Sequence, residues 1–344
     1  MRKPERFKER MRKMLGAVRK AKVAVIGDFG LDAYWFLDEK PGELSAETDL
    51  PTRAVRRQRW GLGGAGNVAA NLAALGIAGV RAFGVVGDDP FGRELLRMLK
   101  DIGVDTGGMI VQRNGWQTQV YGKPFVNETE QPRIDFGRFN KASSRASLQL
   151  LERFEAACRE VSTIVCNQQA PDALLNEEMV GNIVRLMKGL PGHRFIVDSR
   201  HHARLFDSAI LKMNFKEARF FLGKTFTSAE EINLPEATRM AEEIATHTKN
   251  AVFVTCGERG LVARDGVGMT CVDAVRLEGR VDAVGAGDTA GACIAAALDV
   301  GIDLAAAARF ANLAAAVTVK KLYETGTATP AEILDLAGRV GDRD

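Results

Sequence analysis

Long apolar runs, histidines and paired cysteines are all scarce in this sequence of 344 residues. No apolar run reaches about 18 residues, the length that a membrane-spanning helix needs, so no such helix is expected. The N-terminus also lacks the apolar stretch of a signal peptide. The five cysteines form no C-x-x-C pair and the four histidines show no metal-ligand spacing, which argues against a disulfide framework or a zinc site. We predict a cytoplasmic protein whose cysteines are buried thiols.

What remains is an ordinary globular composition, with 46% hydrophobic and 26% charged residues. This composition excludes a disordered, collagen-like or coiled-coil protein. The length suits one large α/β domain or two smaller domains, and it allows a sizeable buried core.

Charge is unevenly placed, because residues 1–22 hold ten of the 47 Lys and Arg side chains but only two of the 44 acidic ones. The remaining body is mildly acidic, which argues against nucleic-acid binding by the whole domain. Within residues 1–22, apolar side chains recur at helical spacing. We predict a basic leader helix there, with a membrane- or nucleic-acid-binding arm as the alternative. The apolar positions are Phe7, Met11, Met14, Leu15 and Val18.

Short β-branched runs alternate with helical stretches along most of the chain, which is the pattern of βαβ units and a largely parallel sheet. No Pro/Ser-rich linker and no repeat divides the chain. We predict one doubly wound α/β domain over residues 23–344, with β excursions at about 33–60 and 108–140 that could pair with each other. The expected strands are 22–27, 80–86, 163–166, 195–198 and 252–255, with a hairpin at 261–275. Helices are expected within 63–75, at 90–99, from 146 onward, at 176–188 and at about 228–247. Two Ala-rich helices, at about 287–299 and 303–320, are expected to close the chain.

The strongest local signal is the Gly-rich turn VDAVGAGDTAGA at residues 281–292, which opens an Ala-rich helix. Backbone N–H groups at a helix N-terminus are unpaired and the macrodipole is positive there, so this turn suits an anion. Gly285 and Gly287, on either side of Ala286, permit close backbone approach. Asp288 beside a bound phosphate could accept a proton from a substrate hydroxyl. The residues alone leave two interpretations, a phosphoryl-transfer site with a general base or a capped helix with a tight turn.

Four further motifs precede this turn. They are GDFGLD at 27–32, GGAGN at 63–67, NFKE at 214–217 and TCGERG at 255–260. With GAGD, and in this order, they resemble the PfkB (ribokinase-like) family of carbohydrate kinases over about residues 20–335. The resemblance implies a ribokinase-like fold, a small β-sheet lid built from the two excursions, and ATP-dependent phosphorylation of a sugar or sugar-phosphate hydroxyl.

Within the family, the stretches GDFGLDAYWF, LSAETDLP, QPRIDF and residues 310–333 are most similar to heptose 7-phosphate kinases. Two stretches depart from that subgroup. Asn167-Gln168-Gln169 stands where those enzymes usually carry an acidic, Lys-containing segment, and Asp198-Ser199-Arg200 replaces Asp-Pro-Lys. Because both stretches lie near the expected substrate mouth, a kinase for ribose, fructose or a nucleoside stays open as an alternative.

The resemblance also implies roles for the matching residues. Asp288 is the expected base, and the backbone N–H groups of Gly285, Ala286 and Gly287 form the expected anion hole. Asn214 and Glu217 would position Mg²⁺, mainly through its waters. The implied sugar ligands are Asp32, Gly63, Gly64, Asn67 and Arg133, with Asp28, Lys123 and Arg138 as further candidates. The implied nucleotide ligands are Asn214, Glu217, Thr255, Gly257, Gly260 and Asn312, of which Asn312 would meet the adenine.

The implied cofactors are ATP and Mg²⁺, and the region of Asp282 and Gly326 matches the place where some relatives hold a monovalent cation such as K⁺. The lid implies a homodimer, since aromatic and partly apolar excursions need cover. No nucleic-acid or membrane partner is expected. A non-catalytic ribokinase-fold binding protein is an alternative that the intact Asp288 opposes. A dinucleotide-dependent oxidoreductase is disfavoured because no G-x-G-x-x-G follows the first strand.

Overall fold

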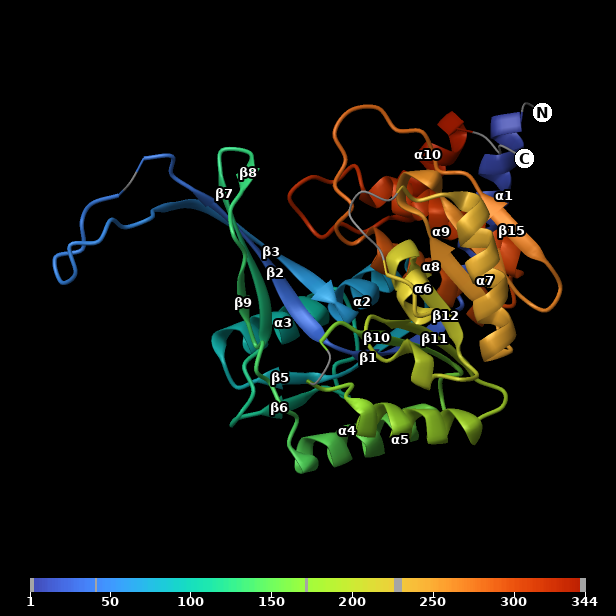
Figure 1. Ribbon diagram of the computed structural model, residues 1–344, viewed down its shortest axis with the longest axis horizontal. Coiled ribbons are helices and arrows are strands. Elements are labelled where there is room, and N and C mark those ends of the chain that lie inside the picture. Colours follow the sequence, from blue (N-terminus) through green and yellow to red (C-terminus); the bar gives the residue numbers. More distant parts are fainter. Residues whose placement is uncertain (1–2, 41, 171–172, 226–230, 341–344) are drawn as a thin grey trace.

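The computed structural model describes residues 3–40, 42–170, 173–225 and 231–340. Its body is an eight-stranded sheet between two layers of helices, and a smaller sheet extends from one side of it (Figure 1). Neighbouring strands of the large sheet are parallel from β4 to β13, and β13, β14 and β15 pair antiparallel. The predicted α/β class with a mostly parallel sheet is therefore confirmed. The strand order is β15 (Met269–Val272), β14 (Leu261–Arg264), β13 (Val252–Thr255), β12 (Ile210–Asn214), β11 (Arg194–Ser199), β10 (Thr163–Gln168), β1 (Lys22–Gly27) and β4 (Gly79–Phe83).

The side chains of β1 point alternately to the two faces of the large sheet, and each face carries its own layer of the hydrophobic core. Val23 and Val25 pack with one set of helices, while Ala24 and Ile26 pack with the other, because successive side chains of a strand point to opposite faces. All four are at most 1% exposed, as expected for a parallel strand covered on both sides. The first layer contains α1 (Lys3–Val18), α2 (Ala65–Ala74), α3 (Pro90–Asp101), α8 (Ala286–Asp299), α9 (Leu304–Thr318) and α10 (Pro330–Val340), and the second contains α4 (Ser144–Ala157), α5 (Glu177–Lys188), α6 (Phe215–Phe221) and α7 (Leu234–Thr248).

Side-chain caps fix where several of these helices begin. Asp89 accepts a hydrogen bond from the N–H of Gly92 at the start of α3, where proline occupies the first turn. Asn176 caps α5 in the same way. Asn233 caps α7, so that helix begins at Leu234 and not near residue 228 as predicted. Residues 226–230 lie outside the described part of the chain.

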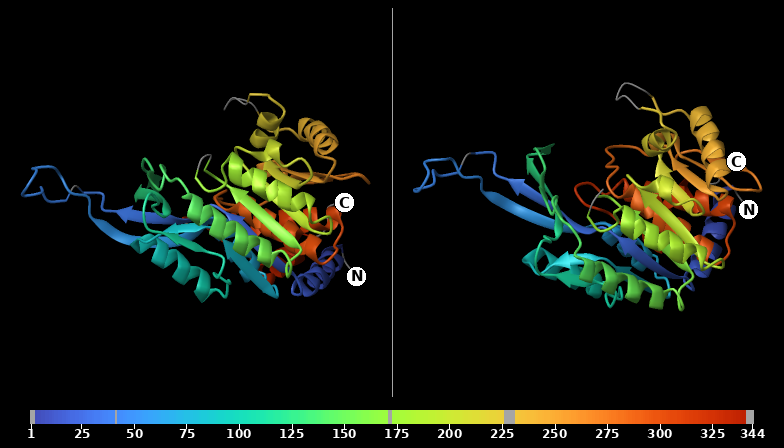
Figure 2. Two further views of the ribbon diagram at one scale, coloured as in Figure 1. Left: turned by 90° about the horizontal axis from the view of Figure 1, so that it is seen from below. Right: turned by 60° about the horizontal axis from the view of Figure 1, so that its bottom comes forward.

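The two predicted excursions do pair, and they form the smaller sheet. β2 (Phe29–Leu37) lies antiparallel to β3 (Val55–Gly64) and parallel to β7 (Gln119–Val126), and the short β8 (Thr129–Glu130) and β9 (Ile134–Phe136) complete it. The tip of the β2–β3 hairpin reaches far from the body in all views (Figures 1 and 2). We call this sheet the lid, because its inner end covers the mouth of the large sheet where β2 directly follows β1.

The basic leader is a helix whose apolar stripe is buried. Met11 and Val18 are fully buried in α1, and Phe7, Met14 and Leu15 are each at most 9% exposed. The stripe belongs to the same hydrophobic cluster as α8 and α10, and the N- and C-terminal helices lie side by side (Figure 1). Two Ala-rich helices were expected to close the chain, and this was wrong, because α10 follows them and packs against α1.

The strand predicted at 80–86 is also wrong as a single element. The chain breaks at Gly84 into β4, which pairs with β1, and β5 (Val85–Gly87), which pairs with β6 (Ile110–Gln112) in a separate two-stranded sheet. A Cβ at Gly84 would lie 2.6 Å from the ring of Phe29, so the close approach of these segments requires glycine at the break.

Four of the five cysteines are buried, as the sequence predicts, but Cys271 on β15 is exposed. None of the five forms a disulfide. Over the described ranges, no helix is both long enough and apolar enough to cross a membrane.

Candidate active site

Asp288 lies at the N-terminal turn of α8, at the edge of the large sheet where the parallel strands end. Its carboxylate accepts hydrogen bonds from two side-chain amides, Asn67 Nδ2 at 3.0 Å and Asn167 Nδ2 at 3.5 Å. Burial raises the pKa of Asp288 to about 6, the Asn67 hydrogen bond opposes this rise, and the nearby Asp198 adds to it. A carboxylate with a pKa near neutrality is suited to accept a proton and to release it again.

The turn before Asp288 has the backbone that an anion site needs. Gly285 caps α8 with a φ of 80°, in the left-handed region, and the helix N–H groups of Ala286 and Gly287 follow it. A Cβ on Gly287 would lie 3.0 Å from Lys212 Nζ, so an ammonium group stands directly against this turn. The positive end of the helix dipole and a cation therefore converge on one small volume beside the carboxylate, and the Ala286 N–H there donates to the carbonyl oxygen of Ala283 at 3.2 Å.

Lys212 is almost completely buried in β12 and forms an ion pair with Asp198 of β11, with Nζ and Oδ2 2.6 Å apart. Burial opposes its charge, but Asp198, Glu217 and Asp288 together raise the pKa of Lys212 above its usual value. The ammonium is thus held in the charged form among three carboxylates. The three carboxylates outnumber the single ammonium, so a phosphate at this place would need a further cation beside it.

Asn214 and Glu217 form a capping box at the start of α6. The Asn214 side chain accepts from Glu217 N at 2.9 Å, and Glu217 Oε2 accepts from Asn214 N at 2.8 Å. Burial and the nearby Asp198 raise the pKa of Glu217, while Lys212 opposes the rise. The capping role of this pair is thus present, and Glu217 also faces the Lys212–Asp198 pair.

The expected sugar ligand Asp32 lies in β2, 5% exposed, at the inner end of the lid. Lys123 Nζ of β7 pairs with its Oδ1 at 2.9 Å, and the Thr325 hydroxyl donates to its Oδ2. Gly63 leaves room for the carboxylate, since a Cβ there would lie 3.3 Å from Asp32 Oδ2. Gly64, with a φ of 55°, begins α2 and so places Asn67 between this side of the site and Asp288.

Asp28, at the end of β1, has a mainly structural environment. Its Oδ2 accepts from the N–H groups of Gln169 and Ala170, at 2.7 and 2.8 Å, which ties β1 to the end of β10. Burial raises its pKa to about 6. Its buried Oδ1 has no hydrogen-bond partner within the described ranges.

Arg133 precedes β9 and is engaged within the lid. Its Nε lies 2.6 Å from Asp135 Oδ1, its Nη2 lies 2.8 Å from Oδ2, and its guanidinium stacks 4.6 Å above the Tyr121 ring. The ion pair with Asp135 raises the pKa of Arg133. A substrate anion would therefore have to share Arg133 with Asp135.

The expected nucleotide residues surround the β13–β15 hairpin. Thr255 ends β13, and the following turn uses Gly257 and Gly260, with φ values of 55° and 102°. A Cβ on Gly260 would collide with the carbonyl oxygen of Val272 at 2.0 Å, so this turn lies against the strand that leads to Asp273.

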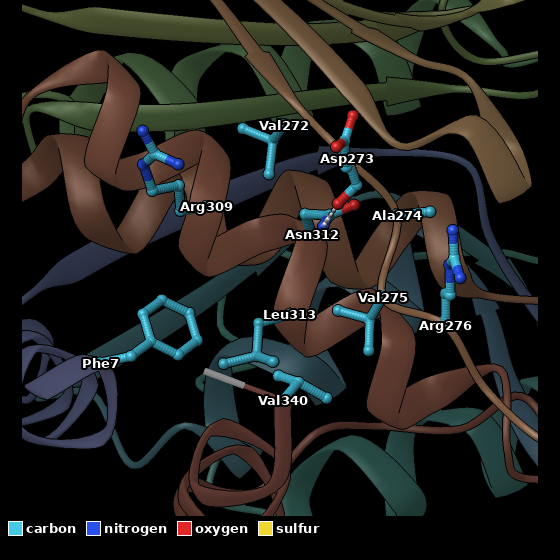
Figure 3. Close-up of a pocket in the computed structure, with 10 residues that line it drawn as sticks. All are labelled: Phe7, Val272, Asp273, Ala274, Val275, Arg276, Arg309, Asn312, Leu313 and Val340. Atoms are coloured by element: carbon cyan, nitrogen blue, oxygen red, sulfur yellow. Dashed lines mark hydrogen bonds between the residues drawn. The ribbon is translucent and has the colours of Figure 1, made fainter. Parts of the chain in front are cut away.

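Asn312 of α9 donates from Nδ2 to the carbonyl oxygen of Asp273 at 2.9 Å. A pocket opens beside this bond, and Figure 3 shows Arg309 and Arg276 on opposite sides of the residues that line it. Phe7 of α1 and Val340 of α10 contribute apolar side chains to it. Apolar side chains beside a few polar groups are the kind of lining that a nucleotide base needs.

No cluster of three or more His, Cys, Asp or Glu side chains in the described ranges could hold a metal by itself. Asp198 nevertheless lies close enough to Glu217 to add to the rise of its pKa that burial causes. Mg²⁺ keeps most of its waters and often takes one or two protein carboxylates beside substrate phosphates, so this pair fits the ion.

Lys212, Asn167 and Thr325 lie in the site but are not among the site residues that the sequence predicts. Lys212 carries a usable signal, since a charged side chain between the apolar residues of Ile210–Met213 is unusual for a buried strand. Asn167 was noted only as a departure from the heptose kinases. Thr325 offered no local pattern, because its partner Asp32 lies 293 positions earlier.

Comparisons with known proteins show the family of the chain and its fold. The family model for pfkB family carbohydrate kinases matches residues 20–332. The chain is 31% identical over 315 residues to the bifunctional protein HldE of Coxiella burnetii. The matched region covers 90% of this chain but only 62% of the length of that protein. The chain is 29% identical over 320 residues to the D-beta-D-heptose 7-phosphate kinase of Bordetella bronchiseptica, covering 92% of this chain and 96% of that protein.

Solved structures share the fold at lower identity. Phosphofructokinase-2 from Escherichia coli in complex with potassium has a TM-score of 0.74 at 17% identity, covering 93% of this chain and 99% of that one. Arabidopsis thaliana ribokinase complexed with ribose and ATP has a TM-score of 0.69 at 20% identity, covering 92% and 99%. The family model spans most of the chain and these folds superpose on nearly all of it, so the chain belongs to the pfkB family of carbohydrate kinases.

Proposed function

We propose that this protein transfers the γ-phosphoryl group of ATP to a hydroxyl of a sugar phosphate, with a heptose 7-phosphate as the first substrate to test. The observation that carries the proposal is the Asp288 carboxylate, which has a raised pKa and lies beside the Gly285–Gly287 turn and the Lys212 ammonium. The heptose substrate is suggested by the Bordetella relative, which is similar along nearly its whole length.

Asp288 acts as the base. It takes the proton of the acceptor hydroxyl while that oxygen bonds to the γ-phosphorus and the bond to the β,γ-bridging oxygen breaks. The amides of Asn67 and Asn167 orient the carboxylate toward the acceptor. Asn67 also has a carbonyl oxygen and therefore has acceptor capacity.

The Gly285–Gly287 turn and Lys212 stabilise the transferring group. The N–H groups are already oriented by the start of α8, so they stabilise developing charge with little reorganisation, and Ala286 N–H would share its present bond to Ala283 O with the phosphoryl group. Lys212 is held by Asp198 at the same place. Loss of one such donor typically costs about 3–4 kcal/mol of barrier.

Mg²⁺ would be held between Asp198, Glu217 and Asn214, partly through water, and it supplies charge neutralisation for the triphosphate. The nucleotide base would lie in the Asn312 pocket, with its phosphates running past Thr255 and Gly257 toward Asp288. A monovalent cation such as K⁺ belongs to the same proposal. Asp282 N donates to Val319 O at 2.8 Å, so the segment before the turn meets the end of α9 where that ion would be bound.

A homodimer through the lid and a cytoplasmic location are also part of the proposal. Leu44, Leu50 and Val55 on the lid hairpin are each at least 50% exposed, and a second lid would cover them. ATP and unpaired cysteines fit the reducing cytoplasm. Sedimentation analysis that finds only monomer at micromolar concentration would contradict the dimer.

The test is an ADP-release assay with ATP, Mg²⁺ and a panel containing heptose 7-phosphate, fructose 6-phosphate, ribose, fructose and adenosine. We expect a sugar phosphate to stimulate release, and D288A to abolish it. E152Q, which removes a carboxylate from the exposed face of α4, should retain the activity. If no acceptor stimulates the wild-type protein, or if D288A stays fully active, the proposal fails.

A further inference from the structure

The loop between α9 and α10 enters the site from the C-terminal side of the chain. Its Thr325 reaches Asp32, the carboxylate proposed to bind the sugar. The Thr325 hydroxyl donates to Asp32 Oδ2 and lies 3.5 Å from the Tyr34 hydroxyl. The same residue faces the anion-hole turn, because a Cβ on Gly285 would lie 3.2 Å from Thr325 Cγ2. One side chain therefore bridges the two parts of the site that must meet during transfer.

The carboxylate of Asp32 is fixed from two sides and still has capacity for a ligand. Lys123 occupies one position on Oδ1 and Thr325 one on Oδ2. An ionised carboxylate offers about four acceptor positions, so about two remain for sugar hydroxyls. Because both oxygens are held, the plane of the remaining acceptor positions is set before the sugar binds.

The backbone that presents Thr325 is unusual and firmly held. Tyr323 has a φ of 56°, a left-handed conformation that non-glycine residues adopt only where their surroundings enforce it. Its ring packs edge-on against Phe36 and Phe125 of the lid, at 6.0 and 5.3 Å between centroids. Its hydroxyl accepts from Arg280 at 3.0 Å.

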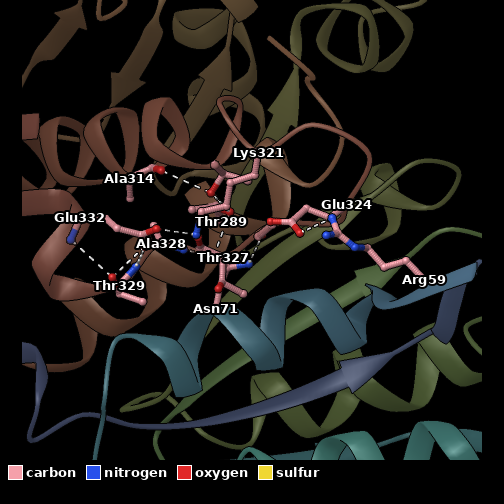
Figure 4. A network of polar contacts seen from close by, with 12 residues as sticks. Arg59, Asn71, Thr289, Ala314, Lys321, Glu324, Thr327, Ala328, Thr329 and Glu332 are labelled. Atoms are coloured by element: carbon pink, nitrogen blue, oxygen red, sulfur yellow. Dashed lines mark hydrogen bonds and ion pairs between the residues drawn. The ribbon is translucent and has the colours of Figure 1, made fainter. Parts of the chain in front are cut away.

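Polar contacts attach the loop to both neighbours. Glu324 pairs with Arg59 of β3 at 2.6 Å, which fastens it to the lid. Beneath it, the buried Asn71 accepts from the N–H of Ala328 at 3.3 Å and from the hydroxyl of Thr289 at 2.9 Å (Figure 4). Thr289 follows Asp288 directly, so the loop is tied to the helix that carries the base.

Resting on the proposed function, we propose that Thr325 is a positioning residue for the acceptor site: it orients Asp32 toward the sugar and couples the lid to the Gly285–Gly287 turn. Its hydroxyl acts on sugar binding, and within the described ranges Thr325 is not one of the residues that line the pocket at Asn312. It therefore acts through Asp32 and not on the reacting atoms.

The first test compares T325V, T325S and T327V in the ADP-release assay. T325V keeps the shape but removes the hydroxyl, so the KM for the sugar phosphate should rise about tenfold, as for a lost hydrogen bond to a charged group, while the KM for ATP stays within twofold. T325S should keep the wild-type KM. T327V removes a hydroxyl from the same loop, leaves the backbone contact between Lys321 Nζ and Thr327 O, and should also keep the wild-type KM.

The second test needs no turnover. Amide hydrogen exchange should speed up in β2 around Asp32 and at Gly285–Gly287 in T325V, and should stay unchanged in T327V. If no acceptor activates the wild-type protein, the proposed function fails, and the exchange data still decide the role of Thr325. A T325V protein with unchanged exchange in both segments, or with a sugar KM within twofold of wild type, would overturn the inference.

Discussion

The raised pKa of Asp288 has a consequence for stability that can be measured without any substrate. A carboxyl whose pKa is about 6 in the fold and 3.8 in the unfolded chain favours the folded state when protonated and opposes it when ionised. The wild-type protein therefore carries a stability cost at pH 8, and this cost fades as the pH falls through about 6 toward 3.8. Replacing Asp288 with Asn, which cannot ionise, should remove the cost.

The size of the effect follows from the shift. About two pH units correspond to about 3 kcal/mol at 1.36 kcal/mol per unit. Asp288 is half-buried, so water screens part of its charge and we expect a gain of about 2 kcal/mol for D288N at pH 8. At pH 5 most wild-type molecules are already protonated, and the gain should drop to roughly half.

Urea denaturation at pH 8 and pH 5 would measure this gain, with unfolding followed by circular dichroism. E152Q is the matched control, since it removes an exposed carboxylate far from the site and should change the free energy of unfolding by at most about 0.5 kcal/mol at either pH. If D288N were no more stable than the wild type at pH 8, or if its gain did not depend on pH, Asp288 would not be a desolvated base.

Three further predictions rest on the same structure. In a pH–rate profile, kcat/KM should rise through a pKa of about 6 and fall about tenfold between pH 8 and pH 5, because the base must be ionised; a flat profile would contradict this. K212M leaves Asp198 buried without its partner, so it should lose activity and about 3–5 kcal/mol of stability, whereas K212M/D198N should regain stability in urea but not activity. M11A removes a fully buried side chain of α1 and should cost about 2–5 kcal/mol in the same assay, while kcat per folded molecule stays unchanged; an unaffected midpoint would show that α1 is not part of the core.

The parts of the fold that a local pattern controls could be predicted from the sequence. The continuous apolar run of KVAVIG and the Gly-rich turn at 285–287 depend on their own residues, and both lie where the sequence predicts them. The helix at Pro330–Val340 was missed although it carried a signal. Thr329 and Glu332 form a reciprocal cap at its start, and this T-x-x-E spacing can be read from the sequence.

The missed site residues depend on contacts between distant segments. Lys212 is recognisable as a site residue only when β12 lies beside β11 and beneath the turn of α8, because its partner Asp198 and its neighbour Gly287 come from separate elements. Gly84 likewise ends a strand because Phe29 lies against it. Propensity and spacing describe a segment alone, whereas these roles follow from which segments become neighbours.

The packing of α1 against α10 bears on how this protein is made. Ribosomes synthesise a chain from its N-terminus, so the apolar stripe of Phe7, Met11 and Val18 is made more than 300 residues before α10, which packs against it. During that interval the stripe needs a temporary cover, from the growing core or from a chaperone. Closure of the first layer over α1 must then wait until α10 has been made, and a chain interrupted before Pro330 would leave part of the apolar stripe of α1 exposed.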